Sequence, residues 1–261
     1  AKNTPDVWCM QEVRAPQNEI DPIFDEFGFE YATAGRIADQ SGLDRMNEIC
    51  RIKGRAGVGL LSALPVIDKR YGLPGLAEDV DSGRWIEADV KTPQGYTVTV
   101  VCVYVHAGNT DDPEKMKQKY RFLDTMLVRM GQLRDEAAHG GKQAVLCGDF
   151  NIAHTPLDIK NAKANEKHAG FLPEERAYVD KWLGELEFVD VMRSLCGDIQ
   201  GPYTWWSQRG RAFDNNVGWR IDYQFATPEL AETARGFVID KAPTYDLRWS
   251  DHAPLSITYD V

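Results

Sequence analysis

The sequence predicts an α/β fold, on the strength of two observations. Short apolar runs of strand length alternate with segments of helical periodicity along the chain. No linker, low-complexity tract or repeat of fixed period divides its 261 residues. Strands that are well mixed among helices are typical of one α/β domain. We therefore expect residues 1–261 to form a single domain.

Short apolar runs predict the strands. The run Trp85–Val90 alternates between two faces, whereas Tyr96–Val105 is apolar almost throughout, which is typical of a central strand. The predicted strands are Val7–Met10, Val58–Leu64, Trp85–Val90, Tyr96–Val105, Ala144–Cys147, Ile221–Ala226 and Leu255–Tyr259.

Start signals and periodicity predict the helices. The clearest helix begins after Asp112, which can cap it, and Pro113 suits its first turn. Gly140 and Gly141 end it, and its apolar face consists of Met116, Tyr120, Leu123, Leu127, Met130 and Leu133. A second helix opens at Pro173 with Glu174 and Glu175 at its positive end, and a third is expected near Pro22, from Phe24 and Phe27.

Composition and charge exclude several classes of protein. With 43% hydrophobic residues, the chain is not disordered, collagen-like or coiled-coil. The longest apolar run, Val98–Val105, is too short to cross a bilayer, and the first residues lack the apolar stretch of a signal peptide. The five cysteines form no C-x-x-C pair, so we expect buried thiols in a reducing compartment. A cytoplasmic protein without a membrane contact is the resulting expectation, nucleoid-associated if the source is bacterial.

The net charge of −10 argues against a protein that simply coats nucleic acid, because phosphate binding depends on Lys and Arg. The negative charge is compatible with an enzyme that binds phosphate through a metal ion held by carboxylates. Two basic clusters stand out, and either alone is typical of a solvated charged face. One consists of Lys115, Lys117, Lys119 and Arg121, and the other, beside a tryptophan-rich stretch, consists of Arg209, Arg211 and Arg220.

Acid and amide side chains follow several predicted strands: Glu12, Asp149 with Asn151, Asp222, and Asp251 with His252. Strand ends are where an α/β scaffold presents functional groups. Hard divalent cations take oxygen ligands, and an Asp-His pair provides an oriented general acid or base.

Each of these residues also has an ordinary structural interpretation. Asp149 and Asn151 can form an Asx turn, and Asp222 can be the ion-pair partner of Arg220. A lone His252 is more often a satisfied, half-buried histidine. Spacing alone does not choose between these alternatives.

Four segments in order give the chain a family resemblance: Pro5–Glu12, Gly148–Asn151, Gly218–Tyr223 and Ser250–Pro254. Together they resemble the exonuclease III family of abasic-site endonucleases, within the endonuclease/exonuclease/phosphatase (DNase-I-like) superfamily. The superfamily shares the strand-end Glu, G-D-x-N and S-D-H; the DNA-repair family is indicated by Phe171–Arg176, Tyr203–Trp206 and the G-W-R-I-D-Y. The resemblance runs from Thr4 to the C-terminus. It implies a four-layer α/β sandwich of two packed mixed β-sheets flanked by helices.

The resemblance also implies roles for the metal-site residues, which are Glu12, Asp149, Asn151 and Asp251. Glu12 matches the metal-binding glutamate, and Asp251 matches a further acid near the metal. Asp149 matches the aspartate that deprotonates the attacking water or, in other accounts, protonates the leaving group. Asn151 matches the amide that holds this aspartate and a phosphate oxygen.

Further matches concern the phosphate and the sugar. Tyr104 matches the tyrosine at the scissile phosphate, and His252, supported by Asp222, matches the histidine there. The apolar pocket for a flipped-out abasic sugar corresponds to Trp205, Trp219 and Ile221. Such a sugar has lost its stacking and costs little to extrude. For Trp206, ordinary core packing is the alternative to a place in this pocket.

The implied reaction is hydrolysis of the phosphodiester 5′ to an abasic site, with Mg²⁺ or Mn²⁺ as cofactor and with added 3′→5′ exonuclease and 3′-phosphatase activity. The implied partner is double-stranded DNA with abasic sites or 3′ ends, bound by a monomer. Its backbone would be held by Lys115 and its neighbours, Lys160, Lys163, Arg209 and Arg211.

One departure concerns the first strand. Family members begin with a strand carrying W-N, whose asparagine helps to bind the metal, but only eleven residues precede Glu12 here and none forms W-N. The chain is therefore expected to lack that strand, through trimming or naturally, and to bind metal less tightly. The loop His106–Gly108 also departs from the family. Two other functions stay open: a superfamily phosphatase acting on inositol phosphates or phospholipid headgroups, and a non-catalytic DNA-binding member.

Overall fold

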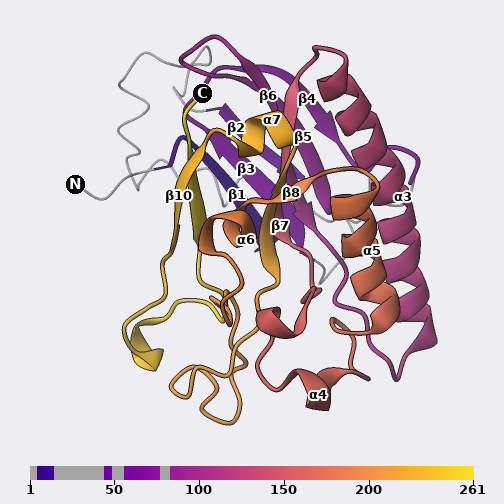
Figure 1. Cartoon of the computed structure of the whole chain (residues 1–261), viewed down its shortest axis with the longest axis vertical. Coiled ribbons are helices and arrows are strands. Elements are labelled where there is room, and N and C mark those ends of the chain that lie inside the picture. Colours follow the sequence, from indigo (N-terminus) through magenta and orange to yellow (C-terminus); the bar gives the residue numbers. More distant parts are fainter. Residues whose placement is uncertain (1–4, 15–43, 49–55, 77–82) are drawn as a thin grey trace. The chain divides into compact units, whose positions relative to one another are not determined.

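The computed structural model describes residues 5–14, 44–48, 56–76 and 83–261 (Figure 1). By its internal contacts the chain divides into two compact units. The first comprises Ala1–Tyr104, Asp135–Gly148 and Val261, and the second comprises Val105–Arg134 and Asp149–Asp260. The helix predicted near Pro22 and the thiol of Cys50 lie outside the described residues.

The first unit contains two sheets that pack on each other. One has the strand order β1 (Val7–Val13), β3 (Gly57–Ser62) and β2 (Asp44–Glu48), all antiparallel. The other runs β4 (Val66–Tyr71), β5 (Trp85–Lys91), β6 (Thr97–Tyr104) and β7 (Gln143–Asp149). Strands β1 and β3 contact β6, and the fully buried Cys102 of β6 lies at this contact, where its thiol donates to the carbonyls of Met10 and Gly59.

The position of β6 between β5 and β7 confirms the prediction of a central strand. Along β5 the carboxylates of Glu87 and Asp89 alternate with apolar side chains, as expected. Both faces of the strand are nevertheless buried, and the two carboxylates are buried with them. Arg70 binds both carboxylates and Lys142 binds Asp89, so the charges are paired rather than exposed. These counter-ions come from β4 and from the residue before β7, so the short apolar run of β5 could not indicate the burial of its carboxylates.

The second unit combines helices with two pairs of antiparallel strands. Strand β8 (Val189–Asp190) pairs with β9 (Asp222–Ala226), and β10 (Ala234–Ile239) pairs with β11 (Leu255–Tyr259). Helix α3 (Pro113–Ala138), of which residues up to Arg134 belong here, runs beside α5 (Pro173–Gly184) (Figure 1). The shorter elements are a 3-10 turn Pro156–Asp158, α4 (Ala162–Asn165), α6 (Val191–Cys196), α7 (Pro228–Ala231) and a 3-10 turn Tyr245–Leu247.

Aromatic packing forms the core of the second unit. The Phe150 ring lies edge-on against Tyr223 and Phe225, and it packs on Trp182 of α5. All four side chains are fully or almost fully buried. Phe150 follows Asp149 directly, so this core fixes the residue between the two polar members of the G-D-x-N motif.

The predicted strands and the two described helices are confirmed, with bounds that differ by at most three residues. Asp112 caps α3 by accepting from the Lys115 N–H, and the helix ends before Gly140, whose φ is +76°. Strands β2, β4, β8 and β10 were not predicted, because charged or small residues interrupt their apolar pattern. Of the cysteines expected to be buried, Cys102 is, whereas Cys9, Cys147 and Cys196 are half-buried; all four are free thiols.

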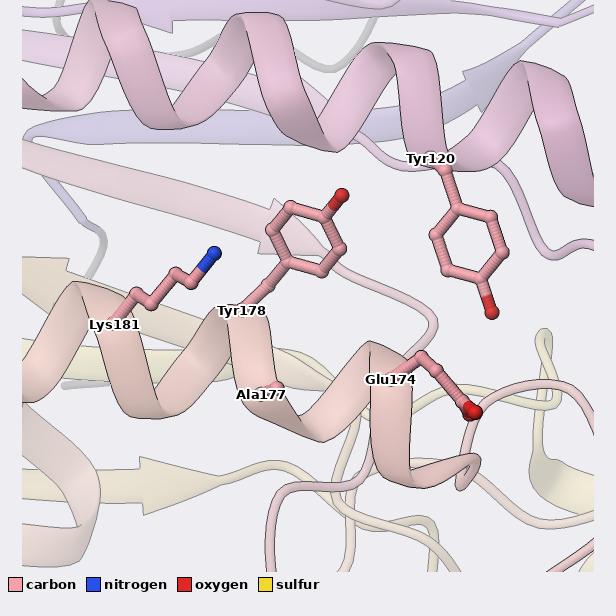
Figure 2. A pocket seen from close by; sticks show the side chains of 5 residues that line it. All are labelled: Tyr120, Glu174, Ala177, Tyr178 and Lys181. Carbon is pink, nitrogen blue, oxygen red and sulfur yellow. The ribbon is translucent and has the colours of Figure 1, made fainter.

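Among the residues that the structure describes, no helix has the length and apolar character needed to cross a bilayer. A shallow pocket does lie between α3 and α5 (Figure 2), lined by Tyr120, Glu174, Ala177, Tyr178 and Lys181. The rings of Tyr120 and Tyr178 stack there with centroids 6.3 Å apart. None of the predicted site residues lines this pocket.

Candidate active site

Asp149 and Asn151 form a tightly bonded pair at the end of β7. The Asp149 carboxylate, 5% exposed, accepts the Asn151 backbone N–H at 2.8 Å and the Asn151 side-chain amide at 2.9 Å. Asn151 adopts a left-handed backbone (φ +50°), which asparagine tolerates better than most residues, and its amide also donates to the Val105 carbonyl. The Asx turn is therefore present, and it holds both side chains in fixed positions.

Gly148 is required by a close approach within the first unit. A Cβ at this position would lie 1.9 Å from the Val103 carbonyl oxygen of the neighbouring strand. Any side chain would push the end of β7 away from β6, and Asp149 is the next residue.

His252 lies between two carboxylates in the second unit. Its Nδ1 is 2.9 Å from Asp222 Oδ2, and its Nε2 is 3.9 Å from Asp149 Oδ2. Thr204 Oγ1 accepts the backbone N–H groups of Ile221 and Asp222, which fixes the start of β9. The order Asp222, His252, Asp149 is that of an oriented acid–base array. Asp222 is thus the partner of His252, and the ion pair with Arg220 considered from the sequence is wrong.

The electrostatics of this array bring the pKa of one carboxylate, that of Asp149, close to neutral pH. Burial, reinforced by the charge of Asp222, raises the pKa of Asp149 to about 7, although His252, the Asn151 N–H and Lys119 oppose the shift. For His252, burial acts to lower the pKa, but the charge and hydrogen bond of Asp222 prevail, aided by Asp149 and Asp251, and raise the pKa to about 10. At pH 7 the histidine is an imidazolium, and Asp149 exchanges its proton readily.

Arg220 is a buried residue that holds neighbouring segments of the site in place. Its guanidinium, fully buried, binds Asp158 at 2.7 Å and Asp190 at 2.7 Å. The expectation that it belongs to a surface basic cluster is therefore wrong. Its backbone N–H donates to the Asp158 carbonyl, so the network also fixes the segment that carries Trp219 and Ile221.

The predicted pocket tryptophans meet edge to face. Trp205 and Trp219 have ring centroids 5.9 Å apart at 86°, and both are half-buried against the cluster that contains Ile221 and Phe171. Ile221 itself is buried and supports the two rings from below the surface. Trp206 packs in a separate core cluster at 2% exposure, in agreement with the core-packing alternative.

Asp251 contacts Trp205 and Trp206 directly. Its Oδ2 accepts the Trp205 indole N–H at 3.0 Å, and its carbonyl accepts the Trp206 N–H. Trp205 also forms an isolated bridge with His252. The tryptophan pair and the acid–base array are therefore adjacent in the second unit.

Glu12 and Tyr104 meet in the first unit. The Tyr104 hydroxyl donates to Glu12 Oε1 at 2.6 Å, while Glu12 Oε2 lies 3.2 Å from Arg14. Glu12 has a left-handed backbone (φ +57°) where β1 shifts register against β3 between Met10 and Val13. Such bulges re-aim a side chain, and left-handed strain in a residue other than glycine is concentrated at functional sites.

The donor chemistry fits a hard divalent cation. The described residues contain no group of three His, Cys, Asp or Glu side chains with metal-site spacing. Mg²⁺ and Mn²⁺ bind through one or two carboxylates, water and a substrate phosphate. Glu12, half-exposed, and Asp251, half-buried, are carboxylates of that kind.

Most of the predicted DNA-binding cations are exposed: Lys115, Lys117, Arg121, Lys160, Lys163, Arg209 and Arg211. Lys119 is a correction, because it is fully buried. Its ammonium group binds Glu175 at 2.5 Å and donates to the carbonyls of Ala107 and Asn151. Glu175 in turn accepts the N–H groups of Gly170 and Leu172.

Sequence reasoning missed this Lys119–Glu175 pair. Lys119 lies three residues after Met116, on the apolar side of the predicted helix, and that position was the available signal. The pair joins α3, α5 and the segment after Asp149, so it supports the site from beneath.

A buried carboxylate that titrates near neutrality, beside an imidazolium held by a second carboxylate, is typical of a hydrolase that moves protons. Comparison with known proteins narrows that class. Residues 1–252 match the model of the Endonuclease/Exonuclease/phosphatase family, and the chain belongs to this family.

Individual relatives point to one branch of the family. The chain is 28% identical to an exodeoxyribonuclease of Bacillus subtilis (strain 168) over 98% of this chain and 88% of that protein. The structure is similar to an AP endonuclease from Archaeoglobus fulgidus (TM-score 0.79, 30% identity, 98% of this chain and 90% of that one). It is also similar to the Neisseria 3′ phosphatase NExo bound to a product DNA hairpin (TM-score 0.77, 26% identity, 100% and 91%).

These similarities confirm the resemblance to exonuclease III-type AP endonucleases and the α/β class, with mixed sheets flanked by helices. The protein is a DNA repair nuclease, and its family is one of divalent-metal-dependent nucleases. The alternative of a phosphatase acting on inositol phosphates or lipid headgroups is not favoured.

Proposed function

We propose that the protein hydrolyses the phosphodiester on the 5′ side of an abasic site in duplex DNA and leaves a 3′-hydroxyl. The observation that carries the proposal is the Asp222–His252–Asp149 array next to the Trp205–Trp219 pair. An array of this kind supplies the proton transfer, and an adjacent apolar pair supplies a place for a sugar without a base. The names of the relatives, an AP endonuclease and an exodeoxyribonuclease, support the same activity.

In the proposed reaction a water molecule attacks phosphorus as the bond from phosphorus to O3′ breaks, and the departing O3′ takes up a proton from solvent to become the 3′-hydroxyl. Asp149, ionised and held by Asn151, takes the proton from the water. His252 as imidazolium stabilises the charge on the phosphoryl oxygens, and the Asn151 amide keeps Asp149 in place. A bound Mg²⁺ or Mn²⁺ would add neutralisation of the phosphate charge.

Glu12 and Asp251 are the proposed cation ligands, with Asp149 and Asn151 as the further candidates, and Tyr104 is the proposed phosphate contact. The short hydrogen bond from Tyr104 to Glu12 supports a shared task for these two residues. Glu12 orients the tyrosine hydroxyl, and its second carboxylate oxygen lies beside that hydroxyl.

The Trp205–Trp219 wall and Ile221 are proposed to accept the abasic sugar and to reject a nucleotide that still bears its base. The exposed cations Lys115, Lys160, Lys163, Arg209 and Arg211 are proposed to hold the phosphate backbone without sequence preference. The same phosphate site would serve 3′→5′ exonuclease and 3′-phosphatase reactions at DNA ends. We further propose that residues 1–261 form one domain and that the protein is a cytoplasmic monomer.

The test uses a 5′-labelled duplex with one tetrahydrofuran abasic analogue. Wild-type protein in Mg²⁺ should give a single cut at the analogue, and EDTA should abolish it. The Asp149→Ala variant should lose at least a hundredfold in rate, because it removes the proton acceptor. A matched control, Glu229→Ala, changes an exposed carboxylate on α7 and should cut like wild type.

Absence of a cut by folded wild-type protein that still binds the duplex would overturn the proposal in favour of a non-catalytic DNA-binding protein. A cut that survives Asp149→Ala would show that the acid–base array is not the catalytic centre.

A further inference from the structure

The segment before His252 presents apolar side chains to solvent. Within five residues Tyr245 is 41% exposed, Leu247 66% and Trp249 84%. Single exposed apolar residues are common on protein surfaces, but a run that ends in an almost fully exposed tryptophan marks an interaction site. Trp249 buries too little of its surface to stabilise the second unit by packing.

The segment is rigidly supported despite its exposure. The Arg248 guanidinium lies 4.2 Å from the centre of the Tyr245 ring and donates to the Trp206 carbonyl at 3.2 Å. Tyr245 packs edge-on against Phe213. Trp249 is therefore held out from a braced loop, which reduces the conformational entropy that it gives up on binding a partner.

The same support joins this segment to a basic loop. Phe213 packs against Trp206 and belongs to the loop that carries exposed Arg209 and Arg211. Residues 207–217 and 240–250 together contain four basic side chains (Arg209, Arg211, Lys241, Arg248) and three acidic ones (Asp214, Asp240, Asp246), a net charge of +1 in a chain of −10. An exposed aromatic ring beside cations on an otherwise acidic protein suits a nucleic acid strand.

Chain length limits where on the DNA this ring can act. Trp249 precedes His252 by three residues, so their Cα atoms are at most about 11 Å apart. Successive nucleotides are spaced by about 3.4 Å along a strand. Trp249 therefore lies within a few nucleotide steps of the phosphate that His252 is proposed to contact.

We propose that Trp249 is a base-stacking residue, which packs its indole against a nucleobase flanking the abasic nucleotide. This inference rests on the proposed function and extends it to a contact outside the acid–base array and the Trp205–Trp219 wall. An abasic site leaves one stacking face of each neighbouring base uncovered, and the indole covers such a face. The ring selects for interrupted stacking, not for sequence, because every base has a π-face.

The first measurement is the dissociation constant for abasic and intact duplexes in EDTA, which needs no turnover. Trp249→Ala should weaken binding of the abasic duplex by about 5- to 100-fold, from the ordinary strength of base–aromatic stacking. Trp249→Phe should keep most of the affinity. Tyr96→Ala, which removes another exposed ring, from the β5–β6 turn, is the matched control and should bind like wild type.

A second measurement reports stacking itself. With 2-aminopurine placed one, two or three steps from the analogue, wild-type protein should quench its fluorescence at one of these positions. Trp249→Ala should lose that quenching. Equal affinity and equal quenching in wild type and Trp249→Ala would overturn the proposal. So would a change of oligomeric state in Trp249→Ala with unchanged DNA binding, because the ring would then serve a second copy of the chain.

Cleavage by wild type separates this proposal from the one on which it rests. If wild type cuts at the analogue and Trp249→Ala binds and quenches normally, only the stacking proposal fails. If wild type binds with the expected quenching but cuts nothing, the stacking proposal stands and the nuclease mechanism fails.

Discussion

At the scale of single residues, two carboxylates give His252 an unusual charge state. Asp222 binds Nδ1 and Asp149 lies beyond Nε2, so the pKa of His252 is raised well above that of an ordinary histidine. The same surroundings act oppositely on Asp149, whose pKa is raised to about 7 by burial and by the charge of Asp222. His252 therefore stays protonated at neutral pH, whereas Asp149 gains and loses its proton there. A hydrolase can use two such groups in different acid–base roles.

The Asp222→Asn variant should lower the pKa of His252 from about 10 toward its ordinary value near 6.5. Because folding raises this pKa, the stability it contributes is complete below about pH 6.5 and is lost as pH rises toward 10. Wild type should therefore lose free energy of unfolding across that window, and Asp222→Asn should lose less. Urea unfolding from about pH 6 to about pH 10.5 measures both slopes. Parallel slopes would show that Asp222 does not hold the charge of His252.

At the scale of secondary-structure elements, a buried ion pair joins the two long helices of the second unit. Lys119 of α3 and Glu175 of α5 are both fully buried and 2.5 Å apart. Each also bonds backbone groups of loops: Lys119 those of Ala107 and Asn151, Glu175 those of Gly170 and Leu172. The pair thus couples the packing of the helices to the segment that carries Asp149.

Lys119→Met should lower the free energy of unfolding by about 3–5 kcal/mol, because it leaves a buried carboxylate without its counter-ion. The double variant Lys119→Met/Glu175→Gln should recover part of that loss, since the charge is then gone. Lys117→Met, on the exposed side of α3, is the control and should change stability by less than about 0.5 kcal/mol. Denaturant unfolding supplies the values; an additive double variant would mean that the two residues do not act as a pair.

At the scale of the whole molecule, an acidic chain has to bind an anionic polymer. The net charge of −10 disfavours approach to DNA, and the proposed source of attraction is a set of exposed cations on particular loops. Arg209 and Arg211 share one such loop, and Lys160 and Lys163 flank α4 or lie in it. Binding should accordingly be weak at high salt and depend on few phosphate contacts.

Replacing Arg209 and Arg211 together by Gln should reduce the slope of log Kd against log salt concentration by about 2, because each arginine that pairs with a phosphate accounts for about 1. The affinity for abasic and intact duplexes should fall by the same factor, because phosphate contacts carry no sequence information. Arg235→Gln, which removes an exposed arginine of β10 paired with Asp260, is the control. An unchanged slope in the double variant would remove this loop from the DNA-binding surface.

Local sequence was enough to predict most of the elements and the residues at strand ends. Asp149, Asn151 and His252 could be predicted because strand, motif and turn are local: an apolar run sets the strand, and an Asx turn closes within three residues. Glu12 and Asp251 follow strands in the same way, whereas resemblance supplied the roles of these residues and added Tyr104. The 2.6 Å hydrogen bond from Tyr104 to Glu12 joins residues 92 positions apart.

The burial of charged residues, by contrast, depends on how distant segments of the chain pack. The sequence predicted Lys119 and Arg220 to be surface cations, and both are fully enclosed in the fold. A charge can be buried only with a counter-ion, and Arg220 finds Asp158 at a separation of 62 residues. Periodicity predicts which face of an element is apolar, but it does not predict which other segment covers that face. The tertiary structure alone therefore decides the ion-pair partners of Lys119 and Arg220 and the exposure of Trp249.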